Sequence, residues 1–269
     1  MSNALEICDL YKSYGDNKVI KGISFDVRQG EIFALLGTNG AGKTTTLECI
    51  EGLKSYDGGS ISRTGKIGVQ LQSSSLPANI KAHEAMRLFA KWNRAPLEDS
   101  VMKALGIDEI KNKQYRDMST GQKRRLHLAI ALIGNPDIIF LDEPTAGLDV
   151  EGRARLHEQI RRLKESGKTI IMASHDMSEV ENLCDRIAIL KDGKIGFMGT
   201  AWELTDKAGA SSVIQIKTSS GEERLTTDNM VDTLLEVLHS YKKRQITVED
   251  IKVERASLEE RFIDIARGD

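Results

Sequence analysis

The chain has 269 residues, of which 40% are hydrophobic and 29% are charged. This mixture is typical of a soluble globular protein and excludes a fibrous or disordered chain. The 38 Lys and Arg residues and 40 Asp and Glu residues leave a net charge of −2, without the basic excess of most nucleic-acid-binding proteins. The length suits one large domain, alone or with a small appendage.

Secretion and membrane insertion are both disfavoured by the sequence. Cys8, Cys49 and Cys184 lie far apart and indicate reduced thiols of a cytosolic protein. Met1–Leu5 has neither the basic nor the apolar part of a signal peptide. Leu126–Leu141, the longest apolar stretch, is interrupted by polar residues, whereas a bilayer span needs about 20 apolar residues in a row. We therefore expect any membrane role to be carried by another polypeptide.

The first segment, about Leu5–Gln72, is rich in short β-like runs that are separated by glycine turns. Glycine pairs and single glycines mark where these runs end. The predicted elements are strands at Lys18–Val27, Glu31–Leu36, Ser60–Ser62 and Lys66–Leu71, and a helix at Thr44–Ile50. A sheet-rich beginning is therefore expected.

The second segment, Ser73–Met118, has a helical pattern. Apolar residues recur at spacings of three and four in Lys81–Trp92 and in Leu97–Leu105, which predicts two helices. Phe89 and Trp92 are three residues apart and share a helix face, so we expect both rings to face a core.

A β/α pattern then returns. Ile138–Leu141 and Thr169–Ala173 are continuous apolar runs, which suit strands buried on both faces of a parallel sheet. The amphipathic stretch Glu151–Glu165 between them predicts a helical crossover. A hairpin is predicted next, with strands at Ile187–Leu190 and Ile195–Met198 and a turn at Asp192–Gly193.

The tail, about Thr205–Asp269, has its own alternation of strand-like and helix-like segments. Its final helix is opened by a capping box, Ser257 with Glu260. The predicted elements are strands at Val213–Lys217 and Gln245–Val253, a helix at Met230–His239, and a last helix that ends near Ala266. We expect a small α/β appendage.

Gly37–Thr44 fits the pattern G-x-x-x-x-G-K-[ST] of a phosphate-binding loop, with a predicted strand before it and a predicted helix after it. The glycines let the backbone N–H groups wrap around phosphate oxygens, and a helix N-terminus favours negative charge. Lys43 is expected to reach the β- and γ-phosphates, and Thr44 to bind Mg²⁺. By itself the motif predicts phosphate binding.

Two acids, Asp142 and Glu143, follow the apolar strand at Ile138–Leu141. Alone, this pattern is more typical of a solvated loop. Combined with a phosphate-binding loop upstream, it indicates a Walker B site, in which Asp142 holds the Mg²⁺ shell and Glu143 takes a proton from attacking water.

Ser119 and Gln122 fit a capping box, so Ser119 is expected to begin a helix that runs to about Ile133. Taken alone, this motif indicates only a helix start. A functional interpretation is that Ser119 and the Gly121 backbone face a phosphate at the same helix terminus.

In this order the motifs resemble those of ATP-binding-cassette (ABC) ATPases, the nucleotide-binding subunits of ABC transporters, from about Leu5 to Met198. Tyr14 matches the aromatic residue that stacks on adenine, and Gln72 matches the glutamine that links Mg²⁺ to the transport partner. Ala146–Asp149 matches the D-loop, and Ser174–Asp176 matches the switch, whose His175 contacts the γ-phosphate. Ser119–Gln122 lies where the family has its signature motif.

The resemblance implies roles for particular residues. Catalysis is assigned to Glu143, His175, Gln72 and Lys43, and Mg²⁺ binding to Thr44, Gln72 and Asp142. Nucleotide contacts are assigned to Tyr14, Gly37, Thr38, Asn39, Gly40, Ala41, Gly42, Lys43, Thr44, Thr45, Ser119, Gly121, Gln122 and Asp149. The implied ligands are ATP and Mg²⁺.

Some assignments have competitors. Tyr11 competes with Tyr14, and Gln70 competes with Gln72, while an isolated histidine such as His175 is more often structural. In the signature, Met118 and Thr120 replace the usual Leu and first Gly. Met for Leu keeps the volume, and Gly121 is retained, so we expect a working site.

The resemblance predicts an α/β fold of the P-loop NTPase class, with a RecA-like core, an antiparallel β subdomain and an inserted helical subdomain. We expect an ATPase domain at 1–204, with the helical subdomain at 73–118, and a small α/β C-terminal accessory domain at 205–269. The tail is expected to stabilise a dimer or cover a surface, with a regulatory role as the alternative.

The implied function is an ATP-hydrolysing subunit that dimerises with a second ATPase subunit, as a homodimer or heterodimer, and powers a separate permease from the cytoplasmic face of the membrane. The resemblance is greatest to bacterial subunits that export drugs, peptides or antibiotics. An importer subunit, a soluble ABC ATPase acting on DNA or ribosomes, and a P-loop kinase are the alternatives. No nucleic-acid partner is expected.

Overall fold

The computed structural model describes residues 2–70, 76–174, 176–206, 212–227, 229–254 and 258–267. The chain divides into two compact units, an N-terminal unit at Met1–Met198 and a C-terminal unit at Gly199–Asp269. The division falls before the boundary proposed from the sequence, since helix α8 (Ala201–Asp206) contacts helix α10 (Leu258–Arg267) of the C-terminal unit.

A sheet in the order β5-β6-β7-β3-β8-β9 forms the centre of the N-terminal unit, within the described residues. Neighbouring strands from β5 to β8 are parallel, and β9 follows β8 through a tight turn in which Asp192 and Gly193 have positive φ. The strands are β3 (Ile32–Gly37), β5 (Ile67–Gln70), β6 (Ile138–Asp142), β7 (Thr169–Ala173), β8 (Arg186–Lys191) and β9 (Lys194–Gly199). The predicted parallel crossover is confirmed by β6 and β7.

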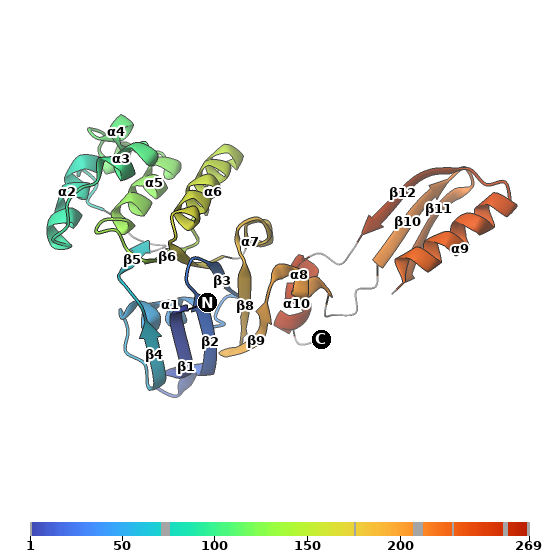
Figure 1. Cartoon of the computed structure of the whole chain (residues 1–269), viewed down its shortest axis with the longest axis horizontal. Helices are drawn as coiled ribbons and strands as arrows, with labels where there is room; N and C mark the ends of the chain where they lie inside the picture. Colours follow the sequence, from blue (N-terminus) through green and yellow to red (C-terminus); the bar gives the residue numbers. More distant parts are fainter. Residues whose placement is uncertain are drawn as a thin grey trace. The chain divides into compact units, whose positions relative to one another are not determined.

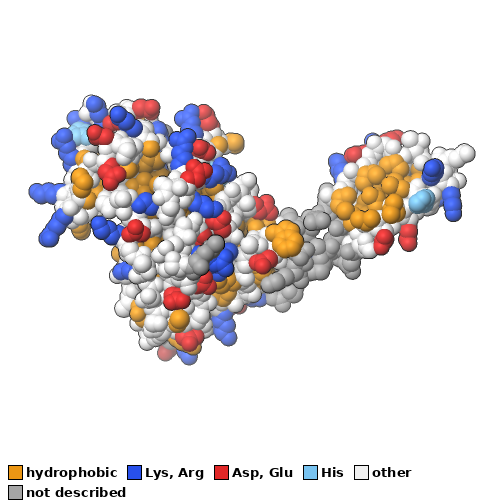
Figure 2. Space-filling model, viewed as in Figure 1, with side chains coloured by type: hydrophobic (Ala, Val, Ile, Leu, Met, Phe, Trp, Pro, Cys, Tyr) orange, Lys and Arg blue, Asp and Glu red, His pale blue; other side chains and the backbone are white. Residues whose placement is uncertain are grey.

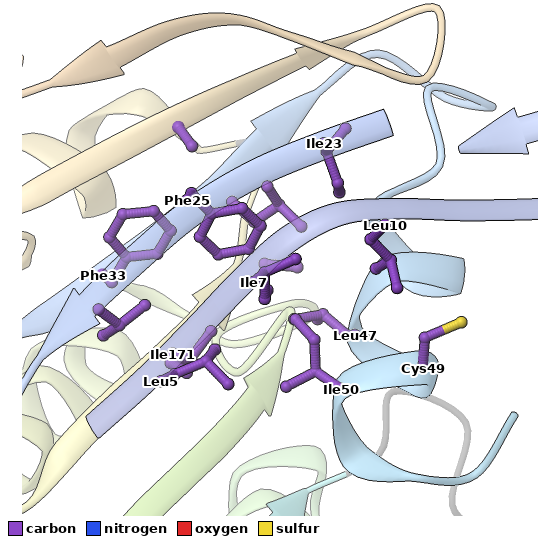
Figure 3. Packing of buried hydrophobic residues seen from close by; sticks show 14 of the residues in the cluster. Leu5, Ile7, Leu10, Ile23, Phe25, Phe33, Leu47, Cys49, Ile50 and Ile171 are labelled. Atoms are coloured by element: carbon purple, nitrogen blue, oxygen red, sulfur yellow. The ribbon is translucent and has the colours of Figure 1, made fainter. Parts of the chain in front are cut away.

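A second sheet of the same unit is antiparallel, in the order β2-β1-β4. Its strands are β1 (Asn3–Tyr14), β2 (Asn17–Arg28) and β4 (Gly58–Arg63). Apolar side chains of β1 and β2 join β3 and helix α1 (Lys43–Glu51) in one core, where the rings of Phe25 and Phe33 stack with centroids 5.4 Å apart (Figure 3). This core anchors the segment between β3 and α1.

The remaining helices of the N-terminal unit lie in the chain between β5 and β8. They are α2 (Ala82–Trp92), α3 (Asp99–Ala104), α4 (Ile107–Ile110), the 3₁₀ helix η1 (Tyr115–Asp117), α5 (Thr120–Ala131), α6 (Val150–Glu165) and α7 (Met177–Leu183). Helices α2 to α5 gather together, apart from the antiparallel sheet (Figure 1). This group of helices is the kind of inserted helical subdomain that the resemblance predicted.

One packing prediction was wrong. Trp92 is 78% exposed at the last turn of α2, where its ring stacks on Phe89 at a centroid distance of 6.3 Å. The two rings therefore share a helix face, as the spacing predicted, but only Phe89 is partly buried. Trp92 is the last residue of α2, and its ring lies at an exposed end of the helix.

The C-terminal unit holds an antiparallel sheet in the order β11-β10-β12, with helix α9 packed on β10. Its elements are β10 (Ser212–Thr218), β11 (Gly221–Thr227), α9 (Met230–Lys243) and β12 (Val248–Glu254), besides α8 and α10. Strand β11 was not predicted, because its sequence GEERLTT lacks an apolar alternation. None of the described helices has the length and apolar composition that a bilayer crossing requires.

Candidate functional site

The segment between β3 and α1 has a backbone that side chains would obstruct. Gly37 has a φ of 156°, and a Cβ there would lie 2.5 Å from the carbonyl oxygen of Leu190. Gly40 and Gly42 have φ values of 83° and 105°, in the region that glycine tolerates best. Thr38 to Gly40 are exposed. The loop therefore presents backbone to solvent at the start of a helix, which suits an anion.

Lys43, the first residue of α1, folds back over this loop. Its Nζ atom donates to the carbonyl oxygens of Gly37, at 2.7 Å, and Thr38, at 3.2 Å. Behind it, the hydroxyl of Thr46 donates to the Gly42 carbonyl at 2.9 Å and fixes the first turn of the helix. The ammonium group thus lies at the mouth of the loop.

The acids Asp142 and Glu143 lie at the carboxyl end of β6, close enough to Lys43 for their charges to interact. Burial raises the pKa of Asp142, and the neighbouring Glu143 carboxylate raises it further. Burial lowers the pKa of Lys43, and the two carboxylates oppose that shift. One cation and two acids therefore share a partly buried site at this edge of the parallel sheet.

Glu143 has a strained backbone. Its φ is 46°, a left-handed conformation that costs a non-glycine residue about 1–2 kcal/mol. Its N–H donates to the carbonyl oxygen of Ala173 at the end of β7, at 3.0 Å. Such strain is often found at functional sites, and nothing in the sequence pattern predicts it.

The Thr44 side chain is exposed and that of Thr45 is half-buried, both in the first turn of α1. Among the described residues, no group of three or more His, Cys, Asp or Glu side chains could hold a metal ion. A threonine hydroxyl and the Asp142 carboxylate are oxygen ligands that Mg²⁺ accepts, and Mg²⁺ typically takes its other ligands from phosphates and water. These residues therefore fit Mg²⁺ that is bound together with a nucleotide.

The two candidate aromatic residues differ in their surroundings. Tyr14 ends β1 and is 44% exposed, with the ammonium groups of Lys12 and Lys54 at 5.3 and 5.4 Å from its ring centroid. Tyr11 lies against the backbone of Gly22, where an added Cβ would meet its hydroxyl at 2.5 Å. Tyr11 is 48% exposed but lies against β2, whereas Tyr14 lies at the end of β1, and the assignment of base stacking to Tyr14 stays a prediction.

Ser119 caps α5 through the predicted capping box. The Gln122 N–H donates to the Ser119 hydroxyl oxygen at 3.3 Å, and the Ser119 N–H donates to the Gln122 side-chain oxygen at 3.1 Å. Lys113 adds a hydrogen bond to the same side-chain oxygen at 2.9 Å. Three hydrogen bonds therefore hold the start of α5, where Ser119 and Thr120 are exposed.

These signature residues share a groove of about 940 Å³ with the start of α6. The Asp149 side chain caps α6 by accepting from the Gly152 N–H at 2.8 Å. A Cβ built on Gly147 would lie 3.5 Å from Cγ2 of Thr120, so the methyl group that departs from the family pattern lies beside Gly147. Within the described part of the chain, the groove lining includes no residue of the loop at Gly37–Thr45.

Gln72 and His175 lie outside the described residues. Gln70, the competitor of Gln72, is 2% exposed, and its amide has no hydrogen-bond partner within the described ranges. On the two sides of position 175, Ser174 donates to Glu179 at 2.5 Å, and Asp176 caps α7.

Sequence reasoning missed Arg153. Its guanidinium donates to the Asp176 carboxylate at 2.8 Å and to the Leu148 carbonyl at 3.4 Å. It therefore connects the predicted D-loop to the predicted switch. Arg153 lies four residues after Asp149, a spacing that places it one helical turn from the D-loop. Arginines are too common on helix surfaces for this spacing to identify a functional residue.

A glycine-rich loop between a strand and a helix, a lysine at its end and acids at the end of another parallel strand of the same sheet define a P-loop NTPase. A family profile described as ABC transporter matches residues 20–146. The linearmycin resistance ATP-binding protein LnrL of Bacillus subtilis is 35% identical over 81% of this chain and 76% of its own length. The Nod factor export ATP-binding protein I of Rhizobium meliloti is 37% identical over 79% of this chain and 69% of its own length.

Among solved structures, cbiO1 of Clostridium perfringens, part of the ABC transporter complex cbiONQ, superposes with a TM-score of 0.70. It is 27% identical, over 77% of this chain and 92% of its own. The chain therefore belongs to the family of ABC transporter ATP-binding proteins. It is an ATPase subunit of a transporter, as the order of its motifs predicted.

Proposed function

We propose that this chain dimerises with a second ATPase subunit and powers a separate permease that exports drugs, peptides or antibiotics. The observation that carries the proposal is the separation of two half-sites. The loop at Gly37–Thr45 lies with the acids, whereas Ser119, Thr120 and Gly121 line another groove. A second subunit facing head to tail brings one half-site of each kind together.

The nucleotide is held mainly by the loop. Backbone N–H groups of Gly37–Thr45 surround the phosphates, and Tyr14 stacks on the adenine. Lys43 releases the carbonyl oxygens of Gly37 and Thr38 and turns to the β- and γ-phosphates. Ser119, Gly121 and Gln122 of the second subunit, with Asp149, close the site.

Hydrolysis is in-line attack of water on the γ-phosphate. Glu143 orients that water and accepts its proton, while Lys43 and His175 offset the negative charge that develops on the phosphate. Thr44, Asp142 and Gln72 hold Mg²⁺, which neutralises phosphate charge when bound.

The transport role is supported by the relatives. LnrL is named for linearmycin resistance, and the Rhizobium protein is named for Nod factor export. Both names fit removal of a compound from the cell, so export is favoured over import. The chain then acts on the cytoplasmic face of the membrane, attached through its permease.

Glu143→Gln tests the catalytic assignment. Because the amide cannot accept the proton, we expect ATP binding to persist and the hydrolysis rate to fall by roughly 10²- to 10⁴-fold. The variant should also form a stable dimer in ATP, seen by analytical ultracentrifugation. Glu165→Gln, on the exposed end of α6, is the matched control and should hydrolyse ATP normally. Wild-type turnover in Glu143→Gln contradicts the proposal.

The permease is tested by cross-linking in cells and purification of the tagged Glu143→Gln chain in ATP. We expect one integral membrane protein to co-purify. In transport assays with the wild-type chain in place of Glu143→Gln, we expect ATP-dependent movement of the cargo out of cells. Uptake instead of efflux supports the importer alternative. Recovery with ribosomes or DNA supports a non-transport ATPase.

A further inference from the structure

In the C-terminal unit, α9 covers only part of one sheet face. Ile214 and Ile216 of β10 are fully buried on that face. Their partners in β12 are Val253 and Ile251, and directly paired residues of antiparallel strands point to the same side. Yet Ile251 is 36% exposed and Val253 is 42% exposed. Within the part of the chain that the structure describes, the β12 side of this face therefore lacks a cover.

Helix α9 adds to this exposed surface. Val231 and Leu235 are four residues apart, on one face of the helix, and they are 58% and 52% exposed. Figure 2 shows a broad hydrophobic area on the C-terminal unit. We name Val231, Leu235, Ile251 and Val253 the C-terminal apolar surface. Large exposed patches of this kind mark interaction sites.

The obvious cover from the same chain is already engaged. Helix α10 contacts α8, and Leu258 of α10 and Leu204 of α8 are 1% and 3% exposed. The apolar side of α10 is therefore used within its own unit.

Strand β12 is also an edge of its sheet. The order β11-β10-β12 leaves its outer side without a partner strand among the described residues. The unpaired N–H and C=O groups of an edge strand are a template for another strand. An apolar face and a free backbone edge thus meet on the same strand.

The charges of β12 select its partner. Asp250 and Lys252 are both exposed and flank Ile251. If two copies of β12 pair antiparallel about a two-fold axis at Ile251, Asp250 of each copy lies opposite Lys252 of the other. Moving the axis to Asp250 or to Lys252 puts like charges opposite each other, which destabilises a strand pair. Of these three axes, only the one at Ile251 brings opposite charges together.

We propose that a second copy of this chain covers the C-terminal apolar surface, by antiparallel pairing of the two β12 strands about Ile251. The two sheets then form one continuous sheet. Because the axis is perpendicular to the sheet, both α9 helices lie on the same face, which is the face that carries Ile251 and Val253. The exposed side chains of Ile251 and Val253 then lie against those of the other copy.

This contact does not need ATP. Joined C-terminal units keep two ATPase units at a high effective concentration after hydrolysis has separated their nucleotide sites. That consequence depends on the proposed function, whereas the contact itself can be tested without nucleotide.

Charge reversal in the full chain is the first test, measured by analytical ultracentrifugation without nucleotide. We expect a wild-type dimer, and roughly tenfold weaker dimerisation for Asp250→Lys and for Lys252→Asp, because each puts like charges together. The double variant, Asp250→Lys with Lys252→Asp, should recover the wild-type affinity. A wild-type chain that stays monomeric, or a double variant no better than the single ones, overturns the proposal.

A cysteine test checks the register, in a Cys8→Ser background that removes the exposed native thiol. In Ile251→Cys the two Cα atoms lie about 5 Å apart across the axis, within disulfide reach. In the matched control Val253→Cys they lie about 14 Å apart. We expect a disulfide dimer only for Ile251→Cys, with ATPase activity retained by Asp250→Lys. Cross-linking of Val253→Cys instead overturns the register.

Discussion

The two units of this chain differ in how completely they bury their apolar residues. In the N-terminal unit, a core between two sheets and α1 leaves side chains such as Phe33, Leu35 and Leu10 with no exposed surface. In the C-terminal unit the core has Ile214, Ile216 and Tyr241 at its centre, and most other contributors are only partly buried. Small units bury a smaller fraction of their surface and are less stable alone.

The difference explains where the chemistry lies. A catalytic site needs rigid support, and every described residue of the candidate ATP site belongs to the N-terminal unit. The C-terminal unit retains an open edge and apolar surface, which suits association. The two units are therefore expected to unfold in separate transitions. Damage to the N-terminal unit should affect ATP binding, and damage to the C-terminal unit should not.

Phe33→Ala should have the largest effect. Phe33 is fully buried and stacks on Phe25, and removing such a ring costs about 3–5 kcal/mol. We expect the melting transition of the N-terminal unit to fall strongly in scanning calorimetry, with ATP binding lost at the lowered transition. Tyr56→Ala, at a site 39% exposed, is the control and should change stability little.

Ile216→Ala should destabilise the C-terminal unit by about 2–4 kcal/mol, because it empties the centre of a small core. In calorimetry of the full chain, the melting temperature of the C-terminal unit should fall while that of the N-terminal unit stays unchanged. ATP hydrolysis should be retained at moderate temperature. A single transition that moves as a whole contradicts the separation of the two units.

Acid should affect the N-terminal unit through His127. Burial lowers the pKa of His127 from 6.5 to about 4, so the folded state favours the neutral ring. Its contribution to stability is complete above pH 6.5 and is lost as the pH falls towards 4. We expect the contribution of His127 alone to fall by roughly 2 kcal/mol, after allowance for solvent screening, whereas Glu51, whose pKa burial raises to about 7, contributes a change of opposite sign over the same range.

Urea unfolding between pH 7 and pH 4.5 measures this loss. The stability of the wild type relative to His127→Gln should fall as the pH is lowered over this range. The exposed His239→Gln, in the C-terminal unit, should keep the wild-type slope. Equal slopes in all three proteins exclude His127 as the cause.

The sequence predicted elements best where burial alone determines them. Strand β7 has the predicted bounds, Thr169–Ala173, because a run of apolar residues has few other ways to fold. The capping box at Ser119 and the loop at Gly37–Thr44 could also be predicted from the sequence, because each depends only on residues that are neighbours in the chain.

Features that depend on contacts between residues far apart in the chain could not be predicted from the sequence. The bridge from Arg153 to Asp176 joins residues from two helices, and a pattern along one helix does not contain it. Trp92 was expected in the core because its spacing is right, but spacing does not say where the partner surface ends. Strand β11 is stabilised by its pairing with β10 rather than by its own composition.

The conformation of Glu143 has a consequence for evolution of the chain in the laboratory. Glycine would adopt its φ of 46° without steric cost, so Glu143→Gly relieves strain at the end of β6. A selection for thermal resistance alone would therefore favour losing this carboxylate, and with it the proposed base. Position 143 is a point where stability and activity oppose each other, and a stabilised variant of this protein should be assayed for turnover before it is used.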